Sequence, residues 1–187
     1  MIVFPKLETE RLVLRRLTWH DREALFNLLA REEVARYMDT TPYTSVDQVG
    51  RLITYLDGLW ERGEGLRWAI TLRQGGKLAG TCGFNNWIRR RGSRGEIGYD
   101  LHPDYWGRGL MTEALRAVVK HGFTTMSLNR IEALVNLDND RSIRVLERLG
   151  FQREGLLREY GFWRGEYWDL YCYSLLRKEW TGGETDI

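Results

Sequence analysis

Apolar and polar residues in the first part of the chain alternate with two different periods. In residues 11–17 (RLVLRRL) the apolar side chains at first occupy every second position, as in a half-buried strand. Thr18 follows in a position to cap a helix that continues to about residue 31. The apolar face of this predicted helix holds Ala24, Leu25, Leu28 and Leu29.

The segment SVDQVGRLITYLDGLWERG contains the clearest helical pattern in the first half of the sequence. Ser45 and Gln48 have the spacing of a capping box, in which each side chain bonds the backbone of the other residue. Gly63 is suited to end the helix because glycine adopts the left-handed conformation without strain. The apolar residues at helical spacing in between are Val49, Leu52, Ile53, Leu56 and Leu59.

After this helix the apolar residues recur at every second position, as in strands. RWAITL and KLAGTCGFNNWI predict two strands joined by a turn at QGGK, and GEIGYDL predicts a third strand. RIEALVN predicts a fourth, and the aromatic residues near the end alternate as in two strands around the turn WRGE, residues 163–166. Two helices lie between these strands, and the second ends at Gly150. The buried stripe of the first is Ala114, Leu115, Val118 and Val119.

This order of elements predicts a mixed α/β fold in which helices cover a central sheet. We count about seven strands and about four helices, and no repeat or linker divides them. A chain of 187 residues is long enough to bury a core without disulfides or metals. The sequence therefore predicts one domain spanning residues 1–187.

Composition and charge argue against several classes of protein. Hydrophobic residues make up 43% and charged residues 29% of the chain, as in ordinary globular proteins. The net charge of +2 is too small to indicate nucleic-acid binding, and no apolar run approaches the roughly 20 residues of a membrane span. The start of the chain lacks the apolar core of a signal peptide. Cys82 and Cys172 have no metal or redox spacing and the three histidines are scattered, so we expect a cytoplasmic protein without a metal.

The stretch DYWGRGLMTEAL places Gly107 and Gly109 directly before a predicted helix. The first N–H groups of a helix are unpaired and partly positive, and glycines let the backbone approach an anion closely. Arg108 adds charge, and Thr112 adds a hydroxyl group. A P-loop is excluded because no Lys-Ser or Lys-Thr pair follows, and a dinucleotide fingerprint because a third glycine is missing. By itself the stretch is either an anion site or a tight strand-to-helix corner.

Three blocks of the sequence resemble the GNAT superfamily of acyl-CoA N-acyltransferases, and within it the RimJ/RimL-type branch of ribosomal-protein N-terminal acetyltransferases. They are LETERLVLRRLTWHD, GEIGYDLHPDYWGRGLMTEAL and NRIEALVNLDNDRSIRVLERLGFQREG, and they occur in the family's order. The resemblance runs from about residue 7 to residue 180. It implies a mixed, mostly antiparallel sheet that is splayed between the fourth and fifth strands.

The same resemblance implies acetyl-CoA as the cofactor and coenzyme A as the co-product. The family's turn pattern falls on Trp106, Gly109 and Met111, and only Gly109 matches it outright. Backbone groups of Leu101 and His102 would bind the pantetheine arm. The backbone N–H groups that would bind the pyrophosphate are those of Arg108, Gly109, Leu110, Met111 and Thr112.

Candidate catalytic residues also follow from the resemblance. Glu96 occupies the position of a glutamate that deprotonates the amine, and the alternative is a strand carboxylate paired with Arg94. Asn139 would contact the cofactor, and Ser142 would contact it and donate a proton to the departing sulfur. Asn and Ser are also ordinary capping residues at the start of a helix. Where many family members have a tyrosine acid, this chain has Leu146.

The implied reaction is direct transfer of an acetyl group to a primary amine, most simply the α-amine of a protein N-terminus of the ribosomal-protein type. The alternatives are a small-molecule amine (a polyamine, aminoglycoside or peptide antibiotic) and a non-catalytic acyl-CoA-binding module. The arginine-rich loop of residues 88–95 would either steer an acidic acceptor or ribosomal RNA, or be a solvated hairpin loop, which is the commoner case. We therefore expect no nucleic acid and no membrane as partners, and a monomer or a homodimer.

Overall fold

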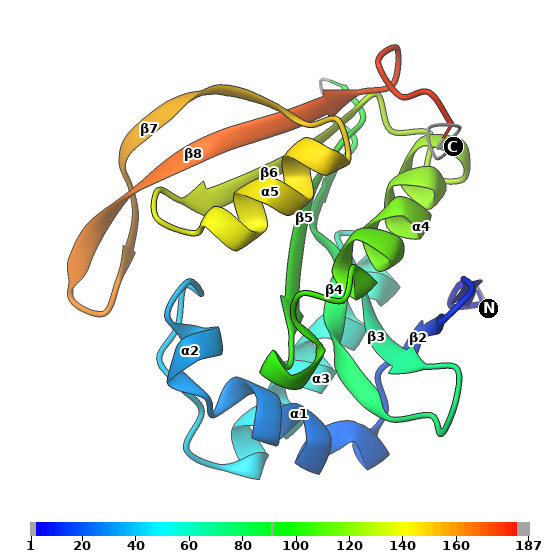
Figure 1. Cartoon of the computed structure of the whole chain (residues 1–187), viewed down its shortest axis with the longest axis vertical. Helices are drawn as coiled ribbons and strands as arrows, with labels where there is room; N and C mark the ends of the chain where they lie inside the picture. The colour runs from blue at the N-terminus through cyan, green and yellow to red at the C-terminus, as the bar shows by residue number, and fades with distance from the viewer. Residues whose placement is uncertain (1–2, 91, 183–187) are drawn as a thin grey trace.

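One open sheet of eight strands forms the centre of the computed structural model, which describes residues 3–90 and 92–182 (Figure 1). The strands are β1 (Leu7–Glu8), β2 (Leu12–Arg16), β3 (Leu66–Leu72), β4 (Leu78–Ile88), β5 (Arg94–Leu101), β6 (Arg130–Asn136), β7 (Gln152–Trp163) and β8 (Glu166–Leu176). They lie in the order β1-β2-β3-β4-β5-β6-β8-β7, and only β5 and β6 are parallel neighbours. The predicted mixed, mostly antiparallel sheet is thus confirmed.

Helices cover both faces of this sheet. Their bounds are α1 (Arg22–Leu29), α2 (Glu32–Ala35), α3 (Val46–Arg62), α4 (Leu110–Thr124) and α5 (Asp140–Arg148), with 3-10 turns η1 (Trp19–Asp21) and η2 (Pro103–Tyr105). On the α4 and α5 face, the larger core cluster includes Leu115 of α4, Leu146 of α5 and Phe84 of β4. On the opposite face, Leu25 of α1 and Ala69 of β3 belong to a second cluster. No helix in the described part of the chain is long and apolar enough to cross a membrane.

Local sequence signals set the ends of the helices. Ser45 caps α3 in the predicted capping box, where the Gln48 side chain accepts from the Ser45 N–H at 3.0 Å. Gly63 ends α3 with a φ of 65°, and Gly150 follows α5 with a φ of 84°. Because these backbone angles favour glycine, both predicted helix ends are confirmed.

Two details differ from the sequence-based expectation. The two-residue strand β1 was not expected from sequence. Its Leu7 pairs with Leu14 of β2 at the edge of the sheet. The single helix expected over residues 18–31 is divided, because Thr18 caps the turn η1 rather than α1. Within α1, Leu25, Leu28 and Leu29 are buried as predicted, whereas Ala24 is exposed because it lies at the margin of that stripe.

The parallel strands β5 and β6 separate after a short paired segment. The paired residues are Arg94, Gly95 and Glu96 of β5 with Arg130, Ile131 and Glu132 of β6. The sequence-based count lacked β1. The fourth and fifth strands of that count are therefore β5 and β6 of the structure. The predicted splay is therefore consistent with the structure. Side chains alternate along β5, so Tyr99 packs towards α5 while Glu96 and Asp100 face the α1 and α3 side.

Candidate active site

A cavity of about 690 Å³ lies where β5 and β6 separate. On one side of the sheet its walls include Leu25 of α1 and Tyr43 from the loop before α3. On the other side they include Asn139 and Ser142 at the start of α5. The cavity therefore passes through the sheet, so a group held on one face can meet a group held on the other.

The glycine turn leaves the start of α4 uncapped and open. Gly109 is the N-cap residue with a φ of 73°, and no side chain caps the helix there. The first helical hydrogen bond runs from the Glu113 N–H to the Gly109 carbonyl at 3.1 Å, so the N–H groups of Leu110, Met111 and Thr112 have no partner within the helix. A Cβ added at Gly107 would meet nothing within 4 Å. This arrangement fits an anionic pyrophosphate.

Side chains around the turn leave that space clear. Met111, whose bulk departs from the family pattern, is 7% exposed because its side chain lies in the core. Arg108 is exposed, and its guanidinium lies 5.8 Å from the centre of the Tyr105 ring. Arg141 of α5 lies 4.2 Å over the Trp106 ring, which connects α5 to the turn that precedes α4. Both guanidinium groups add positive charge near the helix start.

The two residues whose backbone groups are expected to bind pantetheine, Leu101 and His102, differ in how many of these groups already have hydrogen-bond partners. The His102 N–H donates to the Ala79 carbonyl at 2.7 Å, and the His102 carbonyl accepts from Tyr105 at 2.9 Å. The Leu101 carbonyl accepts from the Trp106 indole at 2.7 Å. Three of these four backbone groups therefore already have partners within the fold. Their role in cofactor binding stays a prediction.

Glu96 lies half-buried in the cavity wall, where Asn86 donates to its carboxylate at 3.0 Å. Arg94, the alternative partner considered from sequence, instead pairs with Glu132 at 3.6 Å. Burial raises the pKa of Glu96, and the nearby negative charges of Glu132 and Asp39 raise it further. A carboxyl group with a raised pKa is suited to accept a proton from an amine near neutral pH.

Asn139 and Ser142 meet at the start of α5, on the α5 side of the cavity. The Asn139 side chain accepts from the Ser142 N–H at 3.2 Å, so Asn139 is the helix cap that its sequence position also allowed. The Ser142 hydroxyl lies 2.5 Å from the hydroxyl of Tyr99 on β5. Tyr99 was not predicted as a site residue, although the alternation along GEIGYDL places its side chain on the other face of the sheet from that of Glu96. Burial raises the pKa of Tyr99, which keeps its hydroxyl protonated.

A buried ion pair lies in the cavity wall on the same face of β5 as Glu96, and it was not predicted from sequence either. Arg67 of β3 donates to Asp100 at 2.7 Å and to Thr81 at 2.8 Å, and the two charged side chains are 12% and 5% exposed. Gly98 makes room for this group, since a Cβ there would lie 2.8 Å from the Arg67 guanidinium. The pair gives the cavity a fixed polar wall.

The tip of the β7–β8 hairpin closes the far side of the cavity. Arg164 donates to Glu32 at 2.8 Å, to the Ala35 carbonyl at 2.9 Å and to the Thr40 carbonyl at 3.1 Å. These bonds tie the hairpin tip to the segment around α2, which lies beside it in Figure 1. Aromatic residues of β7 that line the cavity are Tyr160, Phe162 and Trp163.

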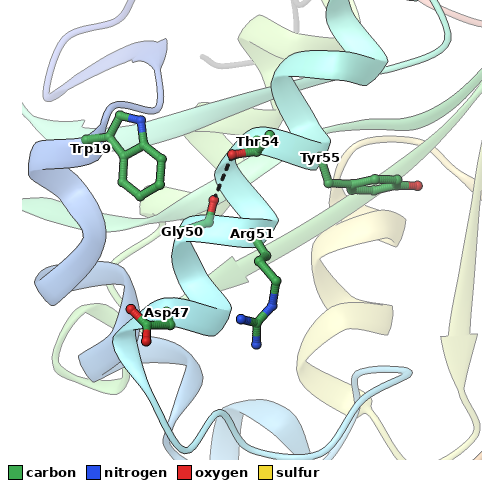
Figure 2. Close-up of a pocket in the computed structure, with 6 residues that line it drawn as sticks. All are labelled: Trp19, Asp47, Gly50, Arg51, Thr54 and Tyr55. Atoms are coloured by element: carbon green, nitrogen blue, oxygen red, sulfur yellow. Dashed lines mark hydrogen bonds between the residues drawn. The ribbon is translucent and has the colours of Figure 1, made fainter.

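Two other surface features lie outside this cavity. In the arginine-rich loop, Arg89 stacks 3.8 Å over the Trp87 ring, and Arg91 lies outside the described residues. Figure 2 shows an open hollow of about 380 Å³ beside α3, where the Trp19 ring lies over Gly50. A Cβ at Gly50 would lie 2.7 Å from that ring, so the absent side chain lets η1 pack closely on α3. Packing between two elements accounts for this hollow.

A fold that can hold an anionic cofactor against one face of its sheet, and can present a carboxylate to an acceptor on the other, is that of an acyl-group transferase. The Acetyltransferase (GNAT) domain family matches residues 11–152. The chain is 42% identical over 176 residues to the uncharacterized N-acetyltransferase p20 of Bacillus licheniformis, covering 94% of this chain and 98% of that protein. It is 33% identical over 107 residues to the [Ribosomal protein uS5]-alanine N-acetyltransferase of Escherichia coli, covering 57% of this chain and 55% of that protein.

The solved structure of Mycobacterium smegmatis RimJ in complex with CoA-disulfide has the same fold. It superimposes with a TM-score of 0.82 at 26% identity, over 90% of this chain and 83% of that one. The chain belongs to the GNAT acetyltransferase family. It is an N-acetyltransferase that uses acetyl-CoA, as its sequence predicted.

Proposed function

We propose that this enzyme acetylates the α-amine at the N-terminus of a protein, of the kind found on ribosomal proteins. The observation that carries the proposal is the cavity through the sheet, which separates a carboxylate side from a cofactor side. The uS5-alanine acetyltransferase of Escherichia coli and the RimJ of Mycobacterium smegmatis are relatives whose names support this acceptor. We assign the reaction to the cytoplasm, in keeping with the free thiols of Cys82 and Cys172.

Acetyl-CoA supplies the acetyl group as an activated thioester. We assign its pyrophosphate to the N–H groups at the start of α4, and contacts to the rest of the cofactor to Asn139 and Ser142. The backbone N–H groups in question belong to Arg108, Gly109, Leu110, Met111 and Thr112. Gly109 is the N-cap of α4, and Leu110, Met111 and Thr112 form its first turn, where the helix dipole favours negative charge.

The chain's own side chains would handle the protons. Glu96 accepts a proton from the acceptor amine on the α1 and α3 side, directly or through a water molecule. Ser142 directs its hydroxyl to the sulfur on the α5 side, and the bond from Tyr99 orients that hydroxyl. A Tyr99 hydroxyl that donates to Ser142 Oγ leaves the single Ser142 hydrogen free for the sulfur. Tyr99 is therefore a positioning residue for Ser142.

An acceptor panel tests the proposal. The purified protein is incubated with acetyl-CoA and, in separate reactions, with alanine- and serine-led peptides, the same peptides with a blocked α-amine and an internal lysine, spermidine, and an aminoglycoside. We expect thiol release only with a free peptide α-amine, and mass spectrometry should locate the acetyl group there. Faster transfer to spermidine, the aminoglycoside or the blocked peptides would contradict the proposed acceptor.

A further inference from the structure

Two buried polar atoms in the cavity wall have no hydrogen-bond partner in the described part of the chain. They are the side-chain oxygen Oδ1 of Asn136, a residue that is 5% exposed, and the indole nitrogen Nε1 of Trp163. Buried polar groups in native proteins almost always have a partner, so an unpartnered pair in one cavity indicates a ligand. One atom accepts a hydrogen bond and the other donates one.

Both side chains are held in place by other contacts. The Asn136 amide nitrogen donates to the Tyr37 carbonyl at 3.2 Å, which fixes the amide so that Oδ1 is its free end. The Trp163 ring stacks on Trp168 with centres 5.6 Å apart and an angle of 4° between the planes. The Trp163 carbonyl accepts from the Trp168 indole at 3.1 Å. Neither Asn136 Oδ1 nor Trp163 Nε1 is therefore free to swing towards another partner.

The two atoms lie on the acceptor side of the sheet. Asn136 ends β6 and bonds Tyr37, while Arg164, next to Trp163, bonds the carbonyls of Ala35 and Thr40. The same short segment of residues 35–40 thus bonds Asn136 directly and holds Arg164, the residue that follows Trp163. Glu96, the proposed base for the amine, lines the same cavity. A ligand that reaches Glu96 with its amine therefore passes near both atoms.

The kind of ligand follows from the pairing of one acceptor with one donor. A protonated polyamine offers only N–H donors, so it would leave the Trp163 indole unpaired. A peptide group offers an N–H and a carbonyl oxygen on adjacent atoms of a nearly extended chain. We propose that Asn136 and Trp163 form a subsite for the peptide backbone that follows the acceptor amine. In this subsite Asn136 Oδ1 accepts from a peptide N–H, and Trp163 Nε1 donates to a peptide carbonyl.

This inference rests on the proposed function, since it assumes a polypeptide acceptor, and it adds the residues that bind the acceptor's backbone.

The first test uses the unaltered enzyme and a pair of alanine-led tetrapeptides. In one peptide an ester oxygen replaces the first peptide N–H. Loss of one hydrogen bond to a buried acceptor should lower kcat/KM about tenfold for the ester. Equal kcat/KM values for the two peptides would overturn the Asn136 half of the subsite.

Variants locate the effect. Asn136→Leu should lower kcat/KM for the peptide and remove the difference between peptide and ester. Trp163→Phe should lower kcat/KM for both acceptors several-fold, because the ring remains and only the N–H is lost. Trp87→Phe is the matched control, since Trp87 Nε1 is also buried and unpartnered but lies outside the cavity, and it should leave kcat/KM unchanged. Identical effects of Trp163→Phe and Trp87→Phe would overturn the Trp163 half.

The acceptor panel separates the two levels of the proposal. Acetylation of spermidine without acetylation of any peptide would overturn the proposed function and the subsite together. Acetylation of the peptide with no discrimination against its ester would overturn the Asn136 half and leave the proposed function standing. The comparison of peptide with ester needs no variant, so it does not depend on how Asn136→Leu folds.

Discussion

The hydroxyl of Tyr99 lies 2.5 Å from the hydroxyl of Ser142, although 43 positions separate the two residues in the chain. Tyr99 comes from β5, the central strand that borders the gap in the sheet, and Ser142 from the first turn of α5. The contact thus connects β5 to α5 across the wall of the cavity. It provides a hydroxyl pair in a protein whose α5 carries Leu146 at the position of the expected tyrosine.

We predict that Tyr99→Phe lowers kcat about tenfold and leaves the KM for acetyl-CoA unchanged. The phenyl ring still fills the same space, so only the hydrogen bond to Ser142 is lost. In a Ser142→Ala background the same change should have little further effect, because the hydroxyl that Tyr99 orients is already absent. Steady-state kinetics of the four proteins in this cycle measure the coupling.

Tyr173→Phe is the control for this cycle, since Tyr173 is a buried tyrosine of β8 that does not line the cavity. Tyr173→Phe also removes a hydroxyl group, and it should leave kcat unchanged. Additive effects of Tyr99→Phe and Ser142→Ala would show that the two hydroxyls act separately.

The raised pKa of Glu96 predicts the shape of the pH profile. A base acts when it is deprotonated, so kcat should be low at acid pH and rise as pH increases through a pKa above the ordinary 4.5. Glu96→Gln should remove this rise and slow transfer about a hundredfold or more. Asp39→Asn should move the rise to lower pH, because one negative charge that raises the Glu96 pKa is lost. An unchanged profile in Glu96→Gln would exclude Glu96 as the base.

Gly109→Ala should weaken CoA binding about tenfold and cost about 1 kcal/mol of stability, because alanine is strained at a φ of 73°. Gly76→Ala offers a matched control in the β3–β4 turn, where φ is 62° and a Cβ would meet nothing within 4 Å. It should cost similar stability without changing CoA affinity. Calorimetric titration with CoA and thermal unfolding of both variants provide the comparison. Equal CoA affinity in the two variants would contradict the assignment of the turn.

Arg67→Met should destabilise the fold by about 3 kcal/mol, since it leaves the carboxylate of Asp100 buried without its cation. Arg16→Met removes an exposed partner from Asp57 and should cost no more than about 1 kcal/mol. Urea unfolding of both variants measures the difference. Similar losses would mean that the buried pair contributes no more than a surface pair.

The features that sequence predicted well are those decided by neighbouring residues. The Ser45 cap, the ends at Gly63 and Gly150, and the open turn at Gly109 each depend on a few adjacent positions. Their backbone angles favour particular residue types, so the sequence pattern carries the geometry. The family blocks placed these elements in one fold and indicated where the sheet opens.

The features that sequence did not predict depend on residues far apart in the chain. The contacts of Tyr99 with Ser142 and of Arg67 with Asp100 exist only once β5 has packed against its neighbours. The burial of Asn136 Oδ1 requires the whole cavity wall. The exposure of Ala24, at the margin of the apolar stripe of α1, is settled only when the helix packs. The alternation along β5 could have placed Tyr99 and Asp100 on opposite faces of the sheet. It could not have identified Ser142 and Arg67 as their partners.

The gap between β5 and β6 has a kinetic consequence. If donor and acceptor approach from opposite helical layers, neither needs to leave before the other arrives. A long polypeptide can leave after acetylation, and an unmodified one can bind, while spent coenzyme A is exchanged on the far side of the sheet. Initial-rate plots should then intersect, as they do for a sequential mechanism in which both substrates are bound before transfer.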